Sequence, residues 1–184
     1  CWCKNPRVYV NDHTDYSRLK PLSYVVMDRK WSDSDTVHLE LPMRIRLTTW
    51  TKNKNSISVH RGPLNYSLKI RERWTRYGGT DRWPAYEVYP TTPWNYGLVA
   101  DIEDPTKSFE VVKRATKPSD KPFSLDGAPI ELIAKGKRIL QWKGEKNGLV
   151  GALPESPVPS DEPTETIRLV PMGCARLRIS SFPR

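Results

Sequence analysis

The sequence predicts an all-β protein, because three segments alternate apolar and polar residues with the period of a β-strand. The longest runs from Val37 to Leu47, and the alternation returns over Leu64–Arg71 and Ala175–Ile179. Successive strand residues point to opposite faces, so each segment can bury one face and expose the other. We therefore expect an antiparallel β-sandwich of the jelly-roll kind.

The strands before residue 75 are expected to form an antiparallel meander, with turn residues such as Asn11-Asp12 and Gly62-Pro63 between them. The segment 37–47 is either one long strand or two strands that bend near Pro42. The expected strands are 7–10, 23–29, 37–47, 57–59 and 64–71. Five apolar residues are expected to share one core, namely Leu39, Leu41, Ile45, Leu68 and Leu177.

The middle of the chain has a different pattern. From Tyr77 to Asp104, Gly and Pro residues are interspersed with many Trp and Tyr residues, which predicts a long ordered loop. Further strands are expected at 109–114 and 130–134, and an extended surface segment at 151–163. We expect one β-sandwich region over 1–184, with core strands in 1–74 and 164–184 and an aromatic, proline-rich insertion at 75–163. Whether the insertion forms a second small β subdomain stays open.

Composition narrows the class of partner. The net charge is +9, but most of the basic residues fall on the outward positions of the expected strands, which is typical of a solvated sheet face. This distribution argues against a nucleic-acid partner, whereas an anionic polysaccharide would suit the positive charge. No stretch approaches the roughly 20 apolar residues of a membrane span, so we expect no membrane partner.

Metal-ligand spacing is not found in the sequence. Cys1, Cys3 and Cys174 form no C-x-x-C pair, and His13, His38 and His60 form no H-E-x-x-H motif. We therefore expect no metal site and no other cofactor.

Aromatic residues supply the candidate binding site. Trp83, Tyr86, Trp94 and Tyr96 lie close together in the sequence. Flat aromatic rings with a polar edge can stack on sugar rings, but large aromatics also dominate protein–protein interfaces. The four residues are therefore candidates either for carbohydrate binding or for docking onto a neighbouring domain.

Acidic residues in the same region allow a third hypothesis. Glycoside hydrolysis requires two carboxyl groups roughly 5 to 9 Å apart, and Glu87, Asp101, Glu103 and Asp104 are the available acids. Glu87 and Asp101 would form the pair in a free-standing glycosidase. The simpler interpretation is that these acids are solvated and stabilise turns.

Several separated motifs resemble one family. The sequence V-H-L-E-L-P-M follows Trp31 at 37–43, and R-G-P-L-N-Y occupies 61–66; the segments 86–98 and 169–179 add further matches. Together they resemble the region that follows the catalytic barrel in beta-L-arabinofuranosidase-like glycoside hydrolases, family 127, also described as DUF1680-like. A departure is Ser34, where the family has Gly before the Asp.

This resemblance implies a non-catalytic role. In the family, the catalytic cysteine and the glutamates around a zinc ion lie in an upstream (α/α) barrel, and Cys1 and Cys3 do not match them. The chain is then no enzyme by itself, has no catalytic residues, and is an accessory β-sandwich region that braces the barrel of a secreted or periplasmic glycoside hydrolase. The alternative is an independent carbohydrate-binding module for plant-type or pectic glycans. The implied partners are the upstream barrel and an arabinose-containing or anionic polysaccharide.

Overall fold

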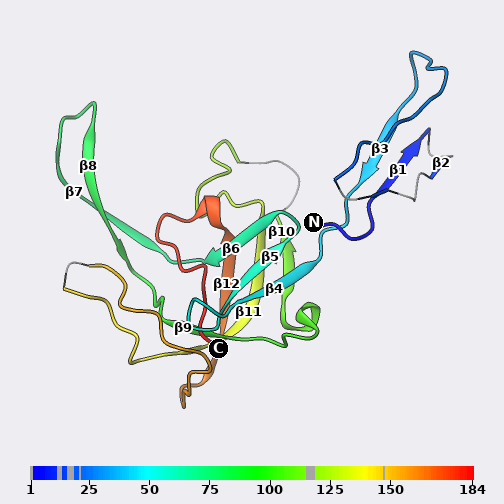
Figure 1. The fold of residues 1–184 in the computed structure, drawn as a ribbon. Helices are drawn as coiled ribbons and strands as arrows, with labels where there is room; N and C mark the ends of the chain where they lie inside the picture. The colour runs from blue at the N-terminus through cyan, green and yellow to red at the C-terminus, as the bar shows by residue number, and fades with distance from the viewer. Residues whose placement is uncertain (1, 12–13, 16–18, 21, 115–118, 147) are drawn as a thin grey trace. The chain divides into compact units, whose positions relative to one another are not determined.

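The computed structural model describes residues 2–11, 14–15, 19–20, 22–114, 119–146 and 148–184. Cys1 and His13 lie outside these ranges. The chain divides into two compact units, residues 1–44 and 45–184, each described by itself below (Figure 1). Helix in the described ranges is limited to two 3-10 turns, η1 (Pro105–Ser108) and η2 (Met172–Cys174), neither with the length of a bilayer-crossing segment. The all-β prediction is confirmed.

Residues 1–44 form a small antiparallel sheet in the order β2-β1-β3. Its strands are β1 (Arg7–Val10), β2 (Thr14–Asp15) and β3 (Val37–Glu40). Asp35 holds the turn before β3, because its carboxylate accepts hydrogen bonds from Asn11 Nδ2 at 2.7 Å and the Ser32 amide at 2.8 Å. These bonds, that of Asn11 first, lower the pKa of Asp35.

The alternation over 37–47 is divided between the two units. β3 ends at Glu40 and β4 (Ile45–Trp50) begins the second unit, so the two-strand alternative is confirmed. The prediction that Leu39 and Leu41 belong to the shared core is wrong, because these residues are 56% and 37% exposed. β3 is an edge strand of a small sheet, and the central strand β1 buries its Val8 and Val10 instead. The strand expected at 23–29 is also wrong, since no strand forms there.

Residues 45–184 contain a seven-stranded antiparallel sheet that curls into a half-barrel. Its strand order is β10-β11-β12-β6-β5-β4. β9 and β10 pair with successive halves of β11, at 135–138 and 130–133. The remaining strand bounds are β5 (Ser56–Arg61), β6 (Leu64–Leu68), β9 (Tyr96–Val99), β10 (Glu110–Lys113), β11 (Ile130–Arg138) and β12 (Thr164–Pro171). β9, β10 and β11 thus belong to the main sheet although their residues fall within 75–163.

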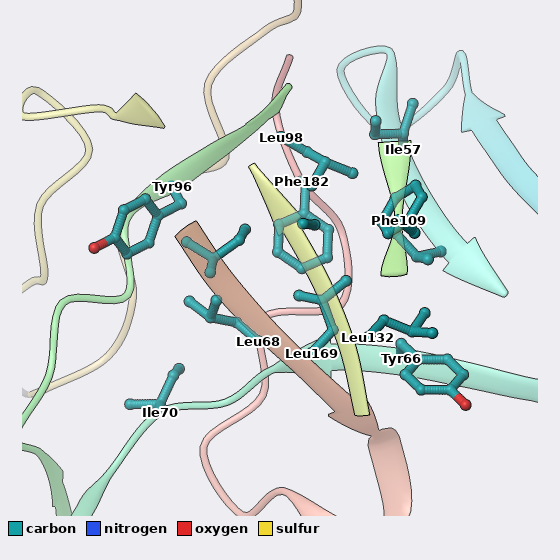
Figure 2. Packing of buried hydrophobic residues seen from close by; sticks show 13 residues of the cluster. Ile57, Tyr66, Leu68, Ile70, Tyr96, Leu98, Phe109, Leu132, Leu169 and Phe182 are labelled. Atoms are coloured by element: carbon teal, nitrogen blue, oxygen red, sulfur yellow. The ribbon is translucent and has the colours of Figure 1, made fainter. Parts of the chain in front are cut away.

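One face of this sheet carries the core, in which Leu68 of β6, Leu132 of β11 and Leu169 of β12 are almost fully buried (Figure 2). Ile45 and Leu177 are partly buried and pack against this cluster. The core expectation is therefore confirmed for Leu68, Ile45 and Leu177. Strand alternation explains the result for Leu68 and Ile45, since their strands have one covered face.

The C-terminal segment 179–184 completes the core. The amide of Ile57 donates to Phe182 O at 2.8 Å, the amide of Phe182 donates to Ile57 O at 2.9 Å, and the amide of Leu98 donates to Pro183 O at 2.8 Å. These bonds connect the tail to β5 and β9, and they place Phe182 inside the cluster with no exposed surface (Figure 2). The strand predicted at 175–179 is wrong, because η2 leads into an irregular segment there.

A two-stranded hairpin occupies much of the predicted loop. β7 (Glu72–Gly79) pairs with β8 (Pro84–Pro90), and in Figure 1 this ribbon extends away from the main sheet. Reciprocal backbone hydrogen bonds of 3.1 Å between Thr80 and Trp83 close its turn. Gly79 has φ +77°, and a Cβ there would lie 2.2 Å from Trp83 O, so this turn requires glycine. The expectation of a long ordered loop over 77–104 is therefore wrong for β8 and β9.

Candidate functional site

The hairpin carries aromatic side chains on both of its faces. Trp74 and Tyr86 lie on one face and meet edge to face, with ring centroids 5.7 Å apart. Both side chains are exposed to solvent. Such a pair is an apolar surface on a strand ribbon that lacks a third strand among the described residues.

The opposite face of the hairpin combines charge with an aromatic ring. The Arg73 guanidinium lies 5.5 Å from the ring centroid of Tyr89, its cross-strand partner. The Tyr89 hydroxyl donates to Glu87 Oε2 at 2.5 Å. This hydrogen bond to a carboxylate raises the pKa of Tyr89. The carboxylate of Glu87 is therefore hydrogen-bonded to Tyr89 on the surface of the hairpin.

The structure separates the four predicted site residues into two places. Trp83, at the hairpin turn, is 73% exposed, and Tyr86 is exposed on β8. Trp94 packs against the core and meets Trp142 at 5.2 Å, whereas Tyr96 is only 6% exposed and donates its hydroxyl to Glu165 Oε2 at 2.8 Å. Trp83 and Tyr86 are thus exposed, whereas Trp94 is partly buried and Tyr96 is buried. A role of these four residues in carbohydrate binding or domain docking stays a prediction.

The acidic residues after β9 stabilise a turn. Asp101 Oδ1 accepts the backbone amides of Glu103 at 2.8 Å and Asp104 at 3.1 Å. Asp104 accepts hydrogen bonds from Thr106 and Lys107, in that order of importance, and both lower the pKa of its carboxyl group. These contacts agree with the simpler interpretation of turn chemistry.

The histidines and cysteines, for which the sequence predicts no metal-binding role, lie on different segments of the chain. His38 is exposed on β3 beside the ring of Tyr9. His60 lies on β5 with its Nε2 buried, and burial, followed by the charge of Arg46, lowers the pKa of the imidazole. Cys3 and Cys174 are both buried. In the described ranges, no three His, Cys, Asp or Glu side chains are grouped as a metal site would require.

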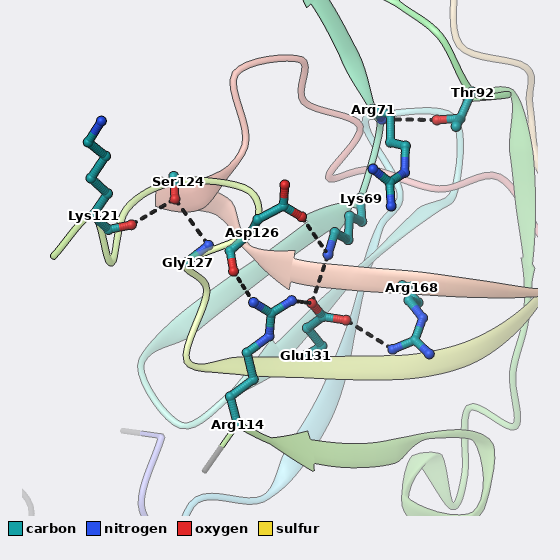
Figure 3. A network of polar contacts seen from close by, with 10 residues as sticks. All are labelled: Lys69, Arg71, Thr92, Arg114, Lys121, Ser124, Asp126, Gly127, Glu131 and Arg168. Carbon is teal, nitrogen blue, oxygen red and sulfur yellow. Dashed lines mark hydrogen bonds and ion pairs between the residues drawn. The ribbon is translucent and has the colours of Figure 1, made fainter. Parts of the chain in front are cut away.

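A buried carboxylate that the sequence reasoning missed lies on β11. Glu131 is 3% exposed and contacts three cations (Figure 3). Lys69 Nζ and Arg114 Nη2 bind its Oε1 at 2.9 and 2.8 Å, and Arg168 Nη1 binds Oε2 at 3.1 Å. Desolvation, the largest single influence, raises the pKa of Glu131, but the hydrogen bonds and charges of the cations together lower it below its ordinary value.

The charged side chains of this cluster lie on the face of the sheet opposite the core, and they line a hollow of about 500 Å³. Strand alternation explains its position, because Glu131 and Arg168 each precede a core residue, Leu132 or Leu169. The only sequence signal for this cluster is Glu131, an acidic residue within a predicted strand. The four charged residues of the cluster come from distant segments, so their convergence has no local signature in the sequence.

Comparisons with known proteins find a family-model match and similar solved structures. A family model described as the middle domain of GH127 beta-L-arabinofuranosidase matches residues 1–43. A solved structure described as a glycoside hydrolase is 21% identical to the chain with a TM-score of 0.55, and the match covers 99% of this chain and 26% of that one. A GH127 beta-L-arabinofuranosidase from Geobacillus stearothermophilus T6 is 17% identical with a TM-score of 0.49, and the match covers 96% and 24% of the two chains. No curated protein matches the chain.

The family-model match confirms the resemblance to the GH127 family for residues 1–43. The family match rests on the first unit, and the TM-score of 0.55 shows a shared fold across nearly the whole chain. The chain spans about a quarter of the length of the solved structures that it matches.

Proposed function

We propose that the chain is a non-catalytic accessory β-sandwich region of a carbohydrate-active enzyme, and that its β7–β8 hairpin docks on an (α/α) catalytic barrel of the same parent protein. The family match to a middle domain supports this role, because a middle domain works beside other domains. The parent protein would be a secreted or periplasmic glycoside hydrolase. The chain would brace its barrel and leave the cleavage chemistry to it.

The observation that carries this proposal is the two-sided aromatic surface of the hairpin. An isolated two-stranded hairpin is marginally stable in water, and large aromatics exposed together mark interaction surfaces. A glycan platform needs one flat aromatic face, whereas Trp74 and Tyr86 lie on one face and Tyr89 on the other. A surface that can be buried from both sides suits insertion against a protein domain.

A second candidate function is an independent module that binds plant-type or pectic glycans. The exposure of Trp83 at the turn favours it, together with the Arg82 guanidinium 5.6 Å from the Trp83 ring. Trp83 could stack on a sugar ring without any contribution from the rest of the hairpin.

The test measures association between this chain and a separately expressed barrel of the parent protein. Docking predicts that Tyr86→Ala and Tyr89→Ala, which lie on opposite faces, each weaken association by about tenfold or more, since buried interface aromatics are common hot spots. Arg46→Gln, on β4, is the matched surface control. Unchanged association for both tyrosine variants would reject docking.

Two further variants separate the other hypotheses. The carbohydrate-binding module would be favoured if the chain bound arabinan or pectic fragments and Trp83→Ala alone abolished that binding. Association with the barrel should then be unchanged in Trp83→Ala. Turnover of an aryl arabinofuranoside by the purified chain, lost in Glu87→Gln, would contradict the non-catalytic role.

A further inference from the structure

We propose that the hollow beside Glu131 binds the carboxylate of an acidic sugar residue, such as a galacturonate unit. The sugar class rests on the proposed function, whereas the choice of an anion rests on the hollow itself. Lys69, Arg71, Arg114 and Arg168 line it together with two acids, Asp126 and Glu131. Four positive and two negative side chains leave a local charge of 4 − 2 = +2.

Arg71 is the cation that remains available to a ligand. Glu131 holds Lys69, Arg114 and Arg168 at 2.8 to 3.1 Å, and Asp126 shares Lys69 at 3.5 Å. Arg71 donates its backbone amide to Thr92 Oγ1, but its exposed guanidinium has no carboxylate partner among the described residues. Figure 3 shows this guanidinium directed back toward Lys69. An incoming anion would supply the missing counter-charge.

The chemistry of the hollow matches a sugar carboxylate. A guanidinium binds a planar carboxylate through two parallel hydrogen bonds. Thr92 and Thr166 add hydroxyl groups, and Pro93 adds an apolar surface. A volume of about 500 Å³ falls in the range of small-ligand sites. The hollow can therefore hold a sugar ring as well as its carboxylate.

The lowered pKa of Glu131 is consistent with this positive environment. Glu131 remains ionised and holds three cations in place, so it builds the site and does not bind the ligand. Asp126 differs from Glu131, because its side chain is 76% exposed and its carboxylate contacts only Lys69 among the described residues. Asp126 is placed to compete with an incoming anion for that amine.

The test titrates the 184-residue chain with trigalacturonate by calorimetry, with neutral arabinotriose as the comparison ligand. We expect trigalacturonate to bind and arabinotriose to bind much more weakly. Arg71→Gln should weaken trigalacturonate binding about 10- to 100-fold, the usual range for a lost hydrogen bond to a charged group. Arg46→Gln removes the same charge from β4, at the far edge of the sheet from β10, and should leave binding unchanged.

A second variant acts in the opposite direction. Asp126→Asn removes an exposed negative charge from the lining and should tighten trigalacturonate binding several-fold. Equal binding by wild type and Arg71→Gln, or no binding by wild type, would overturn the site. Inorganic phosphate or acetate binding as tightly as trigalacturonate would overturn the sugar class.

These results can be read separately from the docking test. Tyr86→Ala and Tyr89→Ala should leave trigalacturonate binding unchanged, and Arg71→Gln should leave association with the barrel unchanged. Failure of the docking proposal would therefore appear in the two tyrosine variants. Failure of the anion site would appear in Arg71→Gln and Asp126→Asn.

Discussion

The main sheet and the β7–β8 hairpin use aromatic residues in opposite ways. In the core of the main sheet, Tyr66 of β6 and Phe182 of the C-terminal segment are fully buried. In the hairpin, Trp74, Trp83 and Tyr86 remain exposed on a two-stranded ribbon. The same residue type therefore stabilises the fold in one region and is left for a partner in the other.

This difference follows from the number of covered faces. The main sheet has one face under the C-terminal segment and its apolar neighbours, so an aromatic side chain on that face is removed from water. The hairpin has no such cover in the described part of the chain, so its aromatics gain little by folding. Substitutions in the two regions should consequently differ in their effect on stability.

The largest effect is expected for Phe182→Ala. Removing a fully buried phenyl ring loses its burial and leaves a cavity, which usually costs about 3 to 5 kcal/mol of unfolding free energy. Trp83→Ala is the matched hairpin change and should cost less than about 0.5 kcal/mol, as exposed substitutions usually do. Chemical denaturation of both variants checks the comparison. Similar midpoints for the two would show that the tail is not part of the core.

A smaller effect is expected for Glu131→Gln, which removes the charge that three cations share. The loss should be about 2 kcal/mol at neutral pH, in the range of hydrogen bonds to charged groups. Because folding lowers the pKa of Glu131, its contribution is present above the unfolded pKa of about 4.3 and is lost as pH falls through the folded pKa.

The pH dependence provides the measurement. Unfolding free energies of wild type and Glu131→Gln should converge as the pH is lowered below about 4.3. Lys135→Gln is a suitable control, since Lys135 is an exposed residue of the same strand. A gap between wild type and Glu131→Gln that stays constant down to acidic pH would contradict the assigned ion pairs.

The contrast between the two regions also explains what the sequence could predict. Strands at 7–10, 57–59, 109–114 and 130–134 were predictable, because one covered face produces alternation. The hairpin was missed because its two faces are alike: Trp74 and Tyr86 on one, Tyr89 on the other. Its glycines and prolines added signals typical of a loop.

Two further features depend on tertiary contacts alone. The alternation at 175–179 is real, yet that segment packs as irregular chain after η2, because its apolar residues reach the core without strand pairing. The candidate anion site draws Lys69, Arg114, Glu131 and Arg168 from separate strands or their ends. Such convergence depends on strand order, and no local pattern in the sequence encodes that order.

The smallest effect on global stability, and the sharpest on the hairpin, is expected for Gly79→Ala. Gly79 has φ +77°, and a Cβ would lie 2.2 Å from Trp83 O and 2.7 Å from the Ala85 amide nitrogen. The turn must therefore shift, which should cost about 1 to 3 kcal/mol locally. Because the hairpin is not part of the core, this cost should appear as opening of β7 from β8 and not as global unfolding.

Gly78→Ala is the matched control, since its Cβ would meet no atom within 4 Å and its φ lies outside the left-handed region. Hydrogen exchange should show faster exchange at the paired amides of β7 and β8 in Gly79→Ala only. Exchange at Leu132 and Leu169 should be unchanged, because these residues belong to the core of the main sheet. If Gly79→Ala instead accelerated exchange at Leu132, the hairpin and the sheet would unfold as one unit. The hairpin would then stabilise the fold as the core does, and its aromatic residues would no longer be explained by a partner alone.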